Sequence, residues 1–166
     1  MGVAEQSFEE LVGSRYDALR RTAFVLCGDH GYAEDLVQNV LAKVYRSWPR
    51  VQGVDDLDAY LHTAVVNASR TWWRRRWHGE RTTAGGADST VDDATADVDL
   101  RMALVEALGR LGSAHREVLA LRFLAGLSEL ETAARLGIAR GTVKSRVSRA
   151  LAELRANGAL QDEVIS

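Results

Sequence analysis

Two clusters of basic side chains are the residues of this sequence best suited to chemistry with a partner. One lies near the middle of the chain and one near its end: Arg70, Arg74, Arg75 and Arg76, then Arg140, Lys144, Arg146, Arg149 and Arg155. Guanidinium and ammonium groups pair with phosphate oxygens, so each cluster predicts contact with a nucleic-acid backbone. The formal net charge of −2 conceals this pattern, because the intervening residues 79–99 carry six acidic side chains and one basic one.

Few residues suit catalysis or metal binding. Cys27 and His30 have a Cys-x-x-His spacing, but a metal site needs more ligands. His62, His78 and His115 lie apart, without a paired nucleophile or a glycine-rich phosphate loop. The single cysteine fits a reducing compartment, and neither a signal peptide nor an apolar stretch of about 20 residues is present. We therefore expect a cytoplasmic protein that is not an enzyme, does not span a membrane and needs no metal or cofactor.

Helical periodicity predicts the elements that carry the first basic cluster. The expected boundaries are 8–27, about 33–48 and about 57–77, with a loop at 49–56. A capping box at residues 7–10 starts the first helix. The second has one broad apolar face that ends with Tyr45 and Trp48, and Pro49 stops it. Asp55 and Asp56 are good N-cap residues for the third.

The second basic cluster lies on the last of several shorter helices. A helical pattern resumes at Leu100 and stops at Gly112, after which Ser113 is expected to cap the next helix. A second capping box, at residues 128–131, starts a short helix, and a glycine turn separates it from a basic helix at 140–156. Short helix, glycine turn and basic helix together predict a helix-turn-helix. The fold class is therefore all-α: two small helical domains, 1–78 and 100–166, joined by an acidic flexible linker at 79–99.

The last helix is predicted to bind duplex DNA through the face opposite its apolar residues. The candidates are Arg140, Gly141, Thr142, Lys144, Ser145, Arg146, Ser148 and Arg149. Arginine can read guanine in the major groove, whereas lysine and hydroxyl groups suit phosphates. Ala139 offers no capping hydroxyl to this helix, which costs on the order of 1 kcal/mol. The alternative is a solvated amphipathic helix at the end of a bundle.

The helix at 57–77 carries a second polar and aromatic stripe. Its candidates for binding DNA are Thr63, Asn67, Arg70, Trp73, Arg74, Arg75 and Trp77. The spacing places Trp72 in the core, whereas Trp73 and Trp77 are expected to be exposed. Exposed aromatic rings beside arginines can stack on unpaired bases. Alternatively, the tryptophans pack against the first helix and the arginines are merely solvated.

The acidic face of the second helix is unsuited to DNA. Glu34, Asp35, Gln38 and Asn39 retain hydrogen-bonding capacity on a rigid element, which suits a protein partner with basic groups. The alternative is a solvated face.

These patterns together resemble the extracytoplasmic-function (ECF) sigma factors of bacterial RNA polymerase. The run Ala33-Glu34-Asp35-Leu36-Val37-Gln38 is similar to the region 2 helix of that family, and Gly141-Thr142-Val143-Lys144-Ser145-Arg146 is similar to its region 4. The resemblance implies that the helix at 57–77 opens and reads the minus-ten element. The loop at 49–56 would then pocket a flipped base, and the last helix would read the minus-thirty-five element. Implied partners are the RNA polymerase core (the coiled coil of its largest subunit and its flap), promoter DNA and an anti-sigma protein.

The sequence departs from the family pattern at a few positions. Gly112 replaces the usual proline, Ala139 a common serine, and Thr132 an isoleucine in the short helix, where it is expected to weaken the core. The Glu-Thr-Ala sequence around Thr132 resembles an actinobacterial subgroup. The rival interpretation is a dimeric helix-turn-helix regulator that binds duplex DNA without polymerase.

Overall fold

In the computed structural model, residues 7–77 and 95–157 are described, with side chains for 7–75 and 102–157. The chain divides into two compact units, Met1–Gly85 and Gly86–Ser166. Every element within the described residues is helical, which confirms the prediction of an all-α protein with two helical domains. None of the described helices has the length and apolar character needed to cross a membrane.

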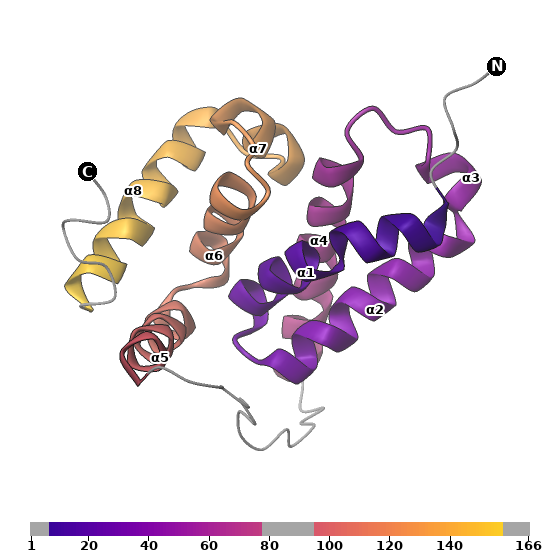
Figure 1. Cartoon of the computed structure of the whole chain (residues 1–166). Helices are drawn as coiled ribbons and strands as arrows, with labels where there is room; N and C mark the ends of the chain where they lie inside the picture. Colours follow the sequence, from indigo (N-terminus) through magenta and orange to yellow (C-terminus); the bar gives the residue numbers. More distant parts are fainter. Residues whose placement is uncertain (1–6, 78–94, 158–166) are drawn as a thin grey trace. The chain divides into compact units, whose positions relative to one another are not determined.

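The described part of the first unit contains four helices (Figure 1): α1 (Phe8–Cys27), α2 (His30–Arg46), α3 (Trp48–Val51) and α4 (Leu57–Trp77). The boundary of α1 and α2 follows from local chemistry. Gly28 ends α1 with a φ of 75°, a left-handed conformation that glycine adopts without steric cost. Asp29 then caps α2 by accepting a hydrogen bond of 3.0 Å from the Tyr32 backbone N–H.

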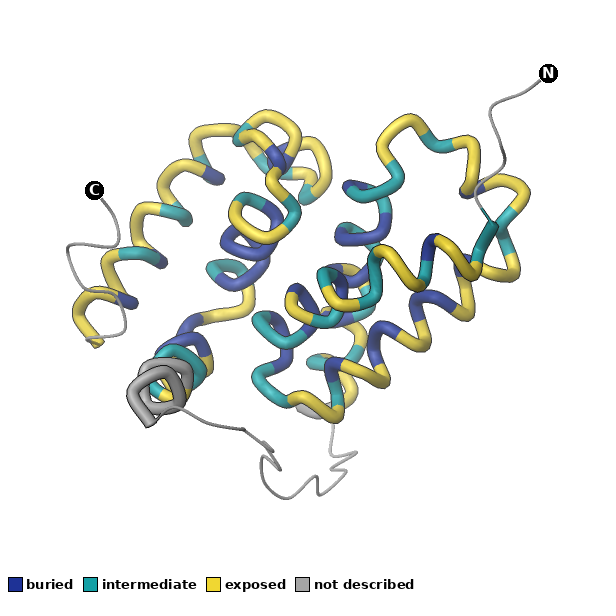
Figure 2. The backbone as a smooth tube through the Cα atoms, in the orientation of Figure 1, coloured by how far each residue is buried: buried dark blue, intermediate teal, exposed yellow. Residues whose placement is uncertain are grey.

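The core of this unit lies where α1, α2 and α4 pack together (Figure 2). Its fully buried or nearly fully buried members are Leu11, Leu19, Leu26, Val37, Val40, Val44, Leu61, Val65 and Val66. On α1 and α2 these residues recur at intervals of one or two helical turns, so each of these helices buries one face, whereas on α4 the adjacent Val65 and Val66 are both buried.

The connection between α2 and α4 differs from the expected loop at 49–56. Helix α2 ends at Arg46, and Ser47 precedes the short helix α3, in which Pro49 occupies the first turn. Proline is compatible with that position, because its missing N–H has no intrahelical partner there. The expectation that Pro49 stops the second helix is therefore wrong. The N-cap prediction for α4 is confirmed: Asp56 accepts a hydrogen bond of 3.0 Å from the Ala59 backbone N–H.

The second unit contains α5 (Thr95–Arg110), α6 (Ser113–Leu119), a π-helical turn η1 (Ala120–Leu124), α7 (Glu129–Leu136) and α8 (Arg140–Ala156). Both halves of the predicted capping box at Ser128 and Glu131 form, with hydrogen bonds of 2.8 and 3.0 Å. Gly137 ends α7 with a φ of 68°. Helices α7 and α8 and the turn between them form the expected helix-turn-helix.

Three details of the second unit differ from expectation. Helix α5 begins at Thr95, so the last five residues of the segment expected as a linker are helical. Gly112, and not Ser113, holds the N-cap position of α6, and no side chain caps this helix. The π-helical turn was not expected at all. One prediction gains support, because Thr132 is fully buried and its hydroxyl has no hydrogen-bond partner among the described residues.

Candidate nucleic-acid interfaces

Helix α8 presents most of the predicted duplex-binding residues on one surface. Arg140, Gly141, Lys144, Ser145, Ser148 and Arg149 are exposed, and Thr142 and Arg146 are half-buried. Val143, Ala150 and Leu154 are buried on the opposite side. The helix is therefore amphipathic in the expected sense, with its basic side available to a partner.

The first turn of α8 is open at its N-terminus. Ala139 is the N-cap and forms no side-chain cap hydrogen bond, as expected from its missing hydroxyl. A side chain added at Gly141 would meet no atom within 4 Å, so packing within the free protein does not require a glycine there. Arg140 is held by Glu129 at the start of α7, with a separation of 3.4 Å between Arg140 Nε and Glu129 Oε2.

A surface hollow of about 280 Å³ adjoins this basic side. It is lined by Arg122, Glu129, Lys144, Val147, Ser148, Leu151 and Arg155. Three cationic side chains around one hollow favour an anionic group, and Glu129 opposes them. The site predicted from sequence did not contain Arg122, which η1 carries and whose guanidinium donates to the Leu127 backbone carbonyl. The sequence signal for this placement was that Arg122 directly follows the apolar Leu121, which is buried in the structure.

Helix α4 exposes part of the predicted single-strand interface. Asn67, Arg70, Arg74 and Arg75 are exposed. Thr63 is half-buried, and its hydroxyl donates to the Ala59 carbonyl at 2.6 Å, within the same helix. The side chain of Trp77 lies outside the described residues.

Trp73 differs from the expected exposed ring. It is half-buried, and its indole N–H donates a hydrogen bond of 3.0 Å to the backbone carbonyl of Leu26 in α1. Its ring meets that of Trp72 edge-on with centroids 4.7 Å apart, and Trp72 in turn contacts Tyr32 at 5.0 Å. Trp73 therefore takes the arrangement that was the alternative to base stacking, packing against the first helix.

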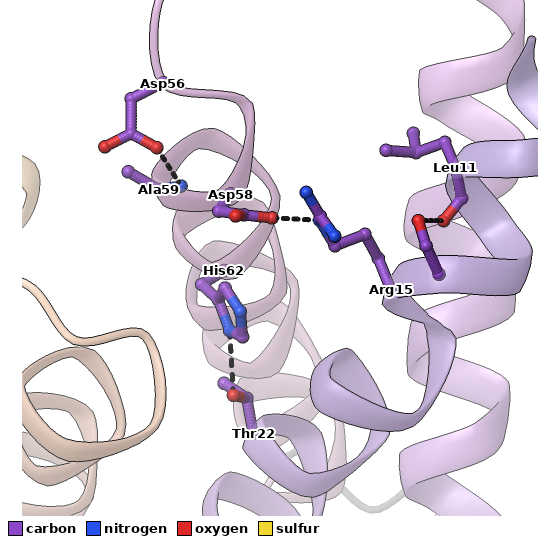
Figure 3. A network of polar contacts seen from close by, with 8 residues as sticks. Leu11, Arg15, Thr22, Asp56, Asp58, Ala59 and His62 are labelled. Carbon is purple, nitrogen blue, oxygen red and sulfur yellow. Dashed lines mark hydrogen bonds and ion pairs between the residues drawn. The ribbon is translucent and has the colours of Figure 1, made fainter. Parts of the chain in front are cut away.

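Polar contacts fix the start of α4 against α1 (Figure 3). Arg15 forms an ion pair with Asp58, and one turn further along Thr22 Oγ1 and His62 Nδ1 share a hydrogen bond of 2.8 Å. His62 is buried, and this desolvation lowers its pKa below the ordinary value of 6.5. The positive charge of Arg15 lowers the pKa further, whereas Asp58 and Asp56 act in the opposite direction.

The predicted acidic docking face is exposed along α2. Glu34, Asp35, Gln38 and Asn39 all lie on the solvent side of this helix. Tyr45, expected on the apolar face, is instead 62% exposed and lies edge-on to Phe8 with ring centroids 5.1 Å apart. It sits eleven residues after Glu34, a spacing that returns to the same side of a helix, so the expected assignment of Tyr45 to the core is wrong.

The Cys-x-x-His pair has a packing role in this structure. Cys27 is buried, and the His30 ring stacks on Phe24 with centroids 4.2 Å apart. No group of three potential ligands among His, Cys, Asp and Glu occurs in the described part of the chain.

Comparison with known proteins matches both units to parts of one family. Residues 11–79 match Sigma-70 region 2, and residues 107–156 match Sigma-70, region 4. The RNA polymerase sigma-E factor of Streptomyces coelicolor is 42% identical over 148 residues, which cover 89% of this chain and 84% of that protein. The ECF RNA polymerase sigma factor SigL of Mycobacterium tuberculosis is 34% identical over 146 residues, covering 82% and 80%.

Solved structures show the same likeness. The sigma factor RpoE of Bartonella quintana, crystallised with the anti-sigma factor NepR, aligns with a TM-score of 0.76 and 30% identity over 93% of this chain and 98% of that one. CnrH, in complex with the cytosolic domain of CnrY, aligns with a TM-score of 0.61 and 25% identity over 90% and 85%.

A region 2 domain followed by a region 4 domain defines the class of RNA polymerase sigma factors. The chain belongs to the ECF group of the sigma-70 family.

Proposed function

We propose that this protein directs core RNA polymerase to specific promoters and initiates transcription there. The observation that carries the proposal is the presence, on one chain, of both sigma-70 regions, each with an exposed basic helix. Promoter opening requires no covalent catalysis by this protein, because the free energy of binding unpaired bases can offset the few kcal/mol that unstacking each base step costs. We expect it to act in the cytoplasm, where polymerase and chromosome are.

The two basic helices receive different targets. We assign the exposed side of α8 to the duplex minus-thirty-five element, since arginine and lysine there suit guanines and phosphates. We assign Asn67, Arg70 and Arg74 of α4 to the melted minus-ten strand. The acidic face of α2 is assigned to the coiled coil of the largest polymerase subunit, where its carboxylates meet basic groups.

An inhibitory partner is part of the proposal. Two structurally similar proteins were solved as complexes: the sigma factor RpoE with the anti-sigma factor NepR, and CnrH with the cytosolic domain of CnrY. We propose that an anti-sigma protein holds this chain inactive by covering the exposed faces of α4 and α8.

Run-off transcription with purified core polymerase and genomic fragments tests the proposal. We expect transcripts from a small set of fragments, and only when the chain and the core are both present. An Arg149→Ala variant should lose these transcripts, whereas Arg21→Ala, which removes an exposed arginine of α1 outside both assigned DNA faces, should retain them. Size-exclusion chromatography tests the rival interpretation, a dimeric helix-turn-helix regulator, by measuring whether the protein is a monomer or a dimer. A dimer that binds palindromic duplexes without polymerase would support that rival.

A further inference from the structure

Three polar links join α1 to α4 in the same order along both helices. The ion pair of Arg15 with Asp58 comes first, the hydrogen bond of Thr22 with His62 second, and that of Leu26 with Trp73 third. The three links therefore reach from the first turn of α4 to its last turns. The first two links hold the start of α4, far from its arginines.

The third link satisfies a backbone group that the helix itself leaves unpaired. Leu26 lies in the last turn of α1, where carbonyl groups lack an intrahelical N–H partner. Leu26 is buried, so an unpaired carbonyl would be costly there. The indole N–H of Trp73 supplies the missing donor at 3.0 Å across 47 residues of sequence. A half-buried tryptophan likewise needs a partner for its N–H.

The position of Trp73 connects this bond to the proposed promoter contacts. Arg74 follows it directly, and Arg70 precedes it by one helical turn; both are exposed. The ring contacts with Trp72 and, through it, with Tyr32 add apolar support from α2. The last turns of α4 therefore contact α1 and α2 through Trp73 and Trp72 on one side, and expose Arg70 and Arg74 on the adjacent side.

We infer that Trp73 is a positioning residue: its bond to the Leu26 carbonyl fixes the end of α4 so that Arg70 and Arg74 meet the melted promoter strand. This rests on the proposed function and replaces base stacking as the role of Trp73. Sites that act on a partner must hold their contacting groups within about 0.5 Å of the productive geometry, and supporting hydrogen bonds provide that precision.

A single-atom change in the full-length chain tests the inference. Benzothienylalanine at position 73 keeps the size and aromatic faces of tryptophan but has sulfur in place of the indole N–H. Promoter opening is followed with core polymerase and a fragment recovered by run-off transcription, labelled with 2-aminopurine in its minus-ten element. We expect the equilibrium constant for opening to fall about three- to tenfold, the effect of losing one hydrogen bond. Retention by core polymerase should not change.

A matched control separates positioning from general stability. Thr22→Val removes the second link, near the start of α4. It should lower the urea midpoint by about as much as benzothienylalanine at position 73 does, but leave the equilibrium constant for promoter opening unchanged. Combining benzothienylalanine with Arg74→Ala should give less than the sum of the separate losses, because the first change acts through the second residue.

Each other outcome overturns the inference. Normal opening with benzothienylalanine means that the N–H is dispensable and that stacking of the retained ring is the better account. Full additivity with Arg74→Ala, or an equal loss of opening in Thr22→Val, leaves only a stability role. Failure of the wild-type chain to open any fragment refutes the proposed function instead, so the two failures are distinguishable.

Discussion

Replacing Thr132 with valine should stabilise the helix-turn-helix unit. Thr132 is fully buried on α7, and its hydroxyl has no partner among the described residues. Burying an unpaired hydroxyl costs about 1–3 kcal/mol in proteins, and valine has nearly the same shape with a methyl group in its place. Both residues are β-branched, so helix propensity changes little. We expect a gain of about 1–2 kcal/mol, which corresponds to an increase of about 1 M in the urea midpoint for a unit of this size.

The distribution of tryptophans along the chain allows the gain in stability to be assigned to one unit. All four tryptophans, at positions 48, 72, 73 and 77, precede the second unit. Tryptophan fluorescence therefore follows the first unit, whereas circular dichroism at 222 nm follows the helices of both. The unfolding of the second unit should therefore appear in the dichroism signal but not in the fluorescence signal. Thr132→Val should raise the urea midpoint of that transition and leave the fluorescence midpoint unchanged. Thr132→Ala is the control, because it removes the hydroxyl but leaves a void, and should gain less or lose stability. An unchanged or lowered midpoint in Thr132→Val would refute the reasoning.

The remaining predictions concern the other parts of the molecule. Because burial lowers the pKa of His62, the unfolded chain binds more protons at this residue than the native chain as the pH falls below about 6.5. The free energy of unfolding of the first unit should therefore decrease as the pH falls from about 6.5 to the lowered native pKa. Urea titrations followed by fluorescence should show this decrease, and His62→Gln should abolish it. Reversing Glu34 and Asp35 to lysine, with Gln38→Ala, should weaken retention by core polymerase at least tenfold in a competition assay, and equal retention would exclude α2 as the docking face. Lys144→Ala should weaken holoenzyme binding to all promoters alike and reduce the salt slope by about one unit, whereas a change confined to some sequences would indicate base reading by this lysine.

Local sequence signals predicted the helix-turn-helix well. The serine and glutamate of the capping box at residues 128–131 and the glycine at 137 act within four residues of chain, so their geometry depends little on the rest of the fold. The absence of a cap at Ala139 was predicted for the same reason.

The sequence also contained a signal that Trp73 packs against α1. His62, Val66, Ser69 and Trp73 are spaced i, i+4, i+7 and i+11, and the first three are buried in the structure. The sequence interpretation used only the more apolar stripe that ends at Trp72, because a histidine and a serine do not signal burial. Helix α4 packs against both α1 and α2, so it buries residues from more than one stripe. Only the packed structure shows which polar residues belong to the second buried stripe.

The π-helical turn could not be obtained from periodicity, whereas the exposure of Tyr45 was indicated by its spacing from Glu34 and was missed because its ring is apolar. In η1 the backbone N–H of Ala125 bonds to the carbonyl of Ala120, five residues back, which shifts the helical register. This turn carries Arg122 into the wall of the basic hollow. Tyr45 is amphipathic and suits either side of a helix, and on the exposed side its ring contacts that of Phe8.

We propose further that the two basic helices, α4 and α8, contact one promoter together only when core polymerase holds the two units at the right separation. Fluorescence anisotropy on a labelled promoter duplex, with and without core polymerase, tests this directly. The account predicts that the free chain binds the promoter weakly and no better than a scrambled duplex, and that the holoenzyme prefers the promoter by about a thousandfold, at the lower end of specificity ratios for DNA-binding proteins. Tight, specific binding by the free chain, undiminished in the absence of core polymerase, would contradict it.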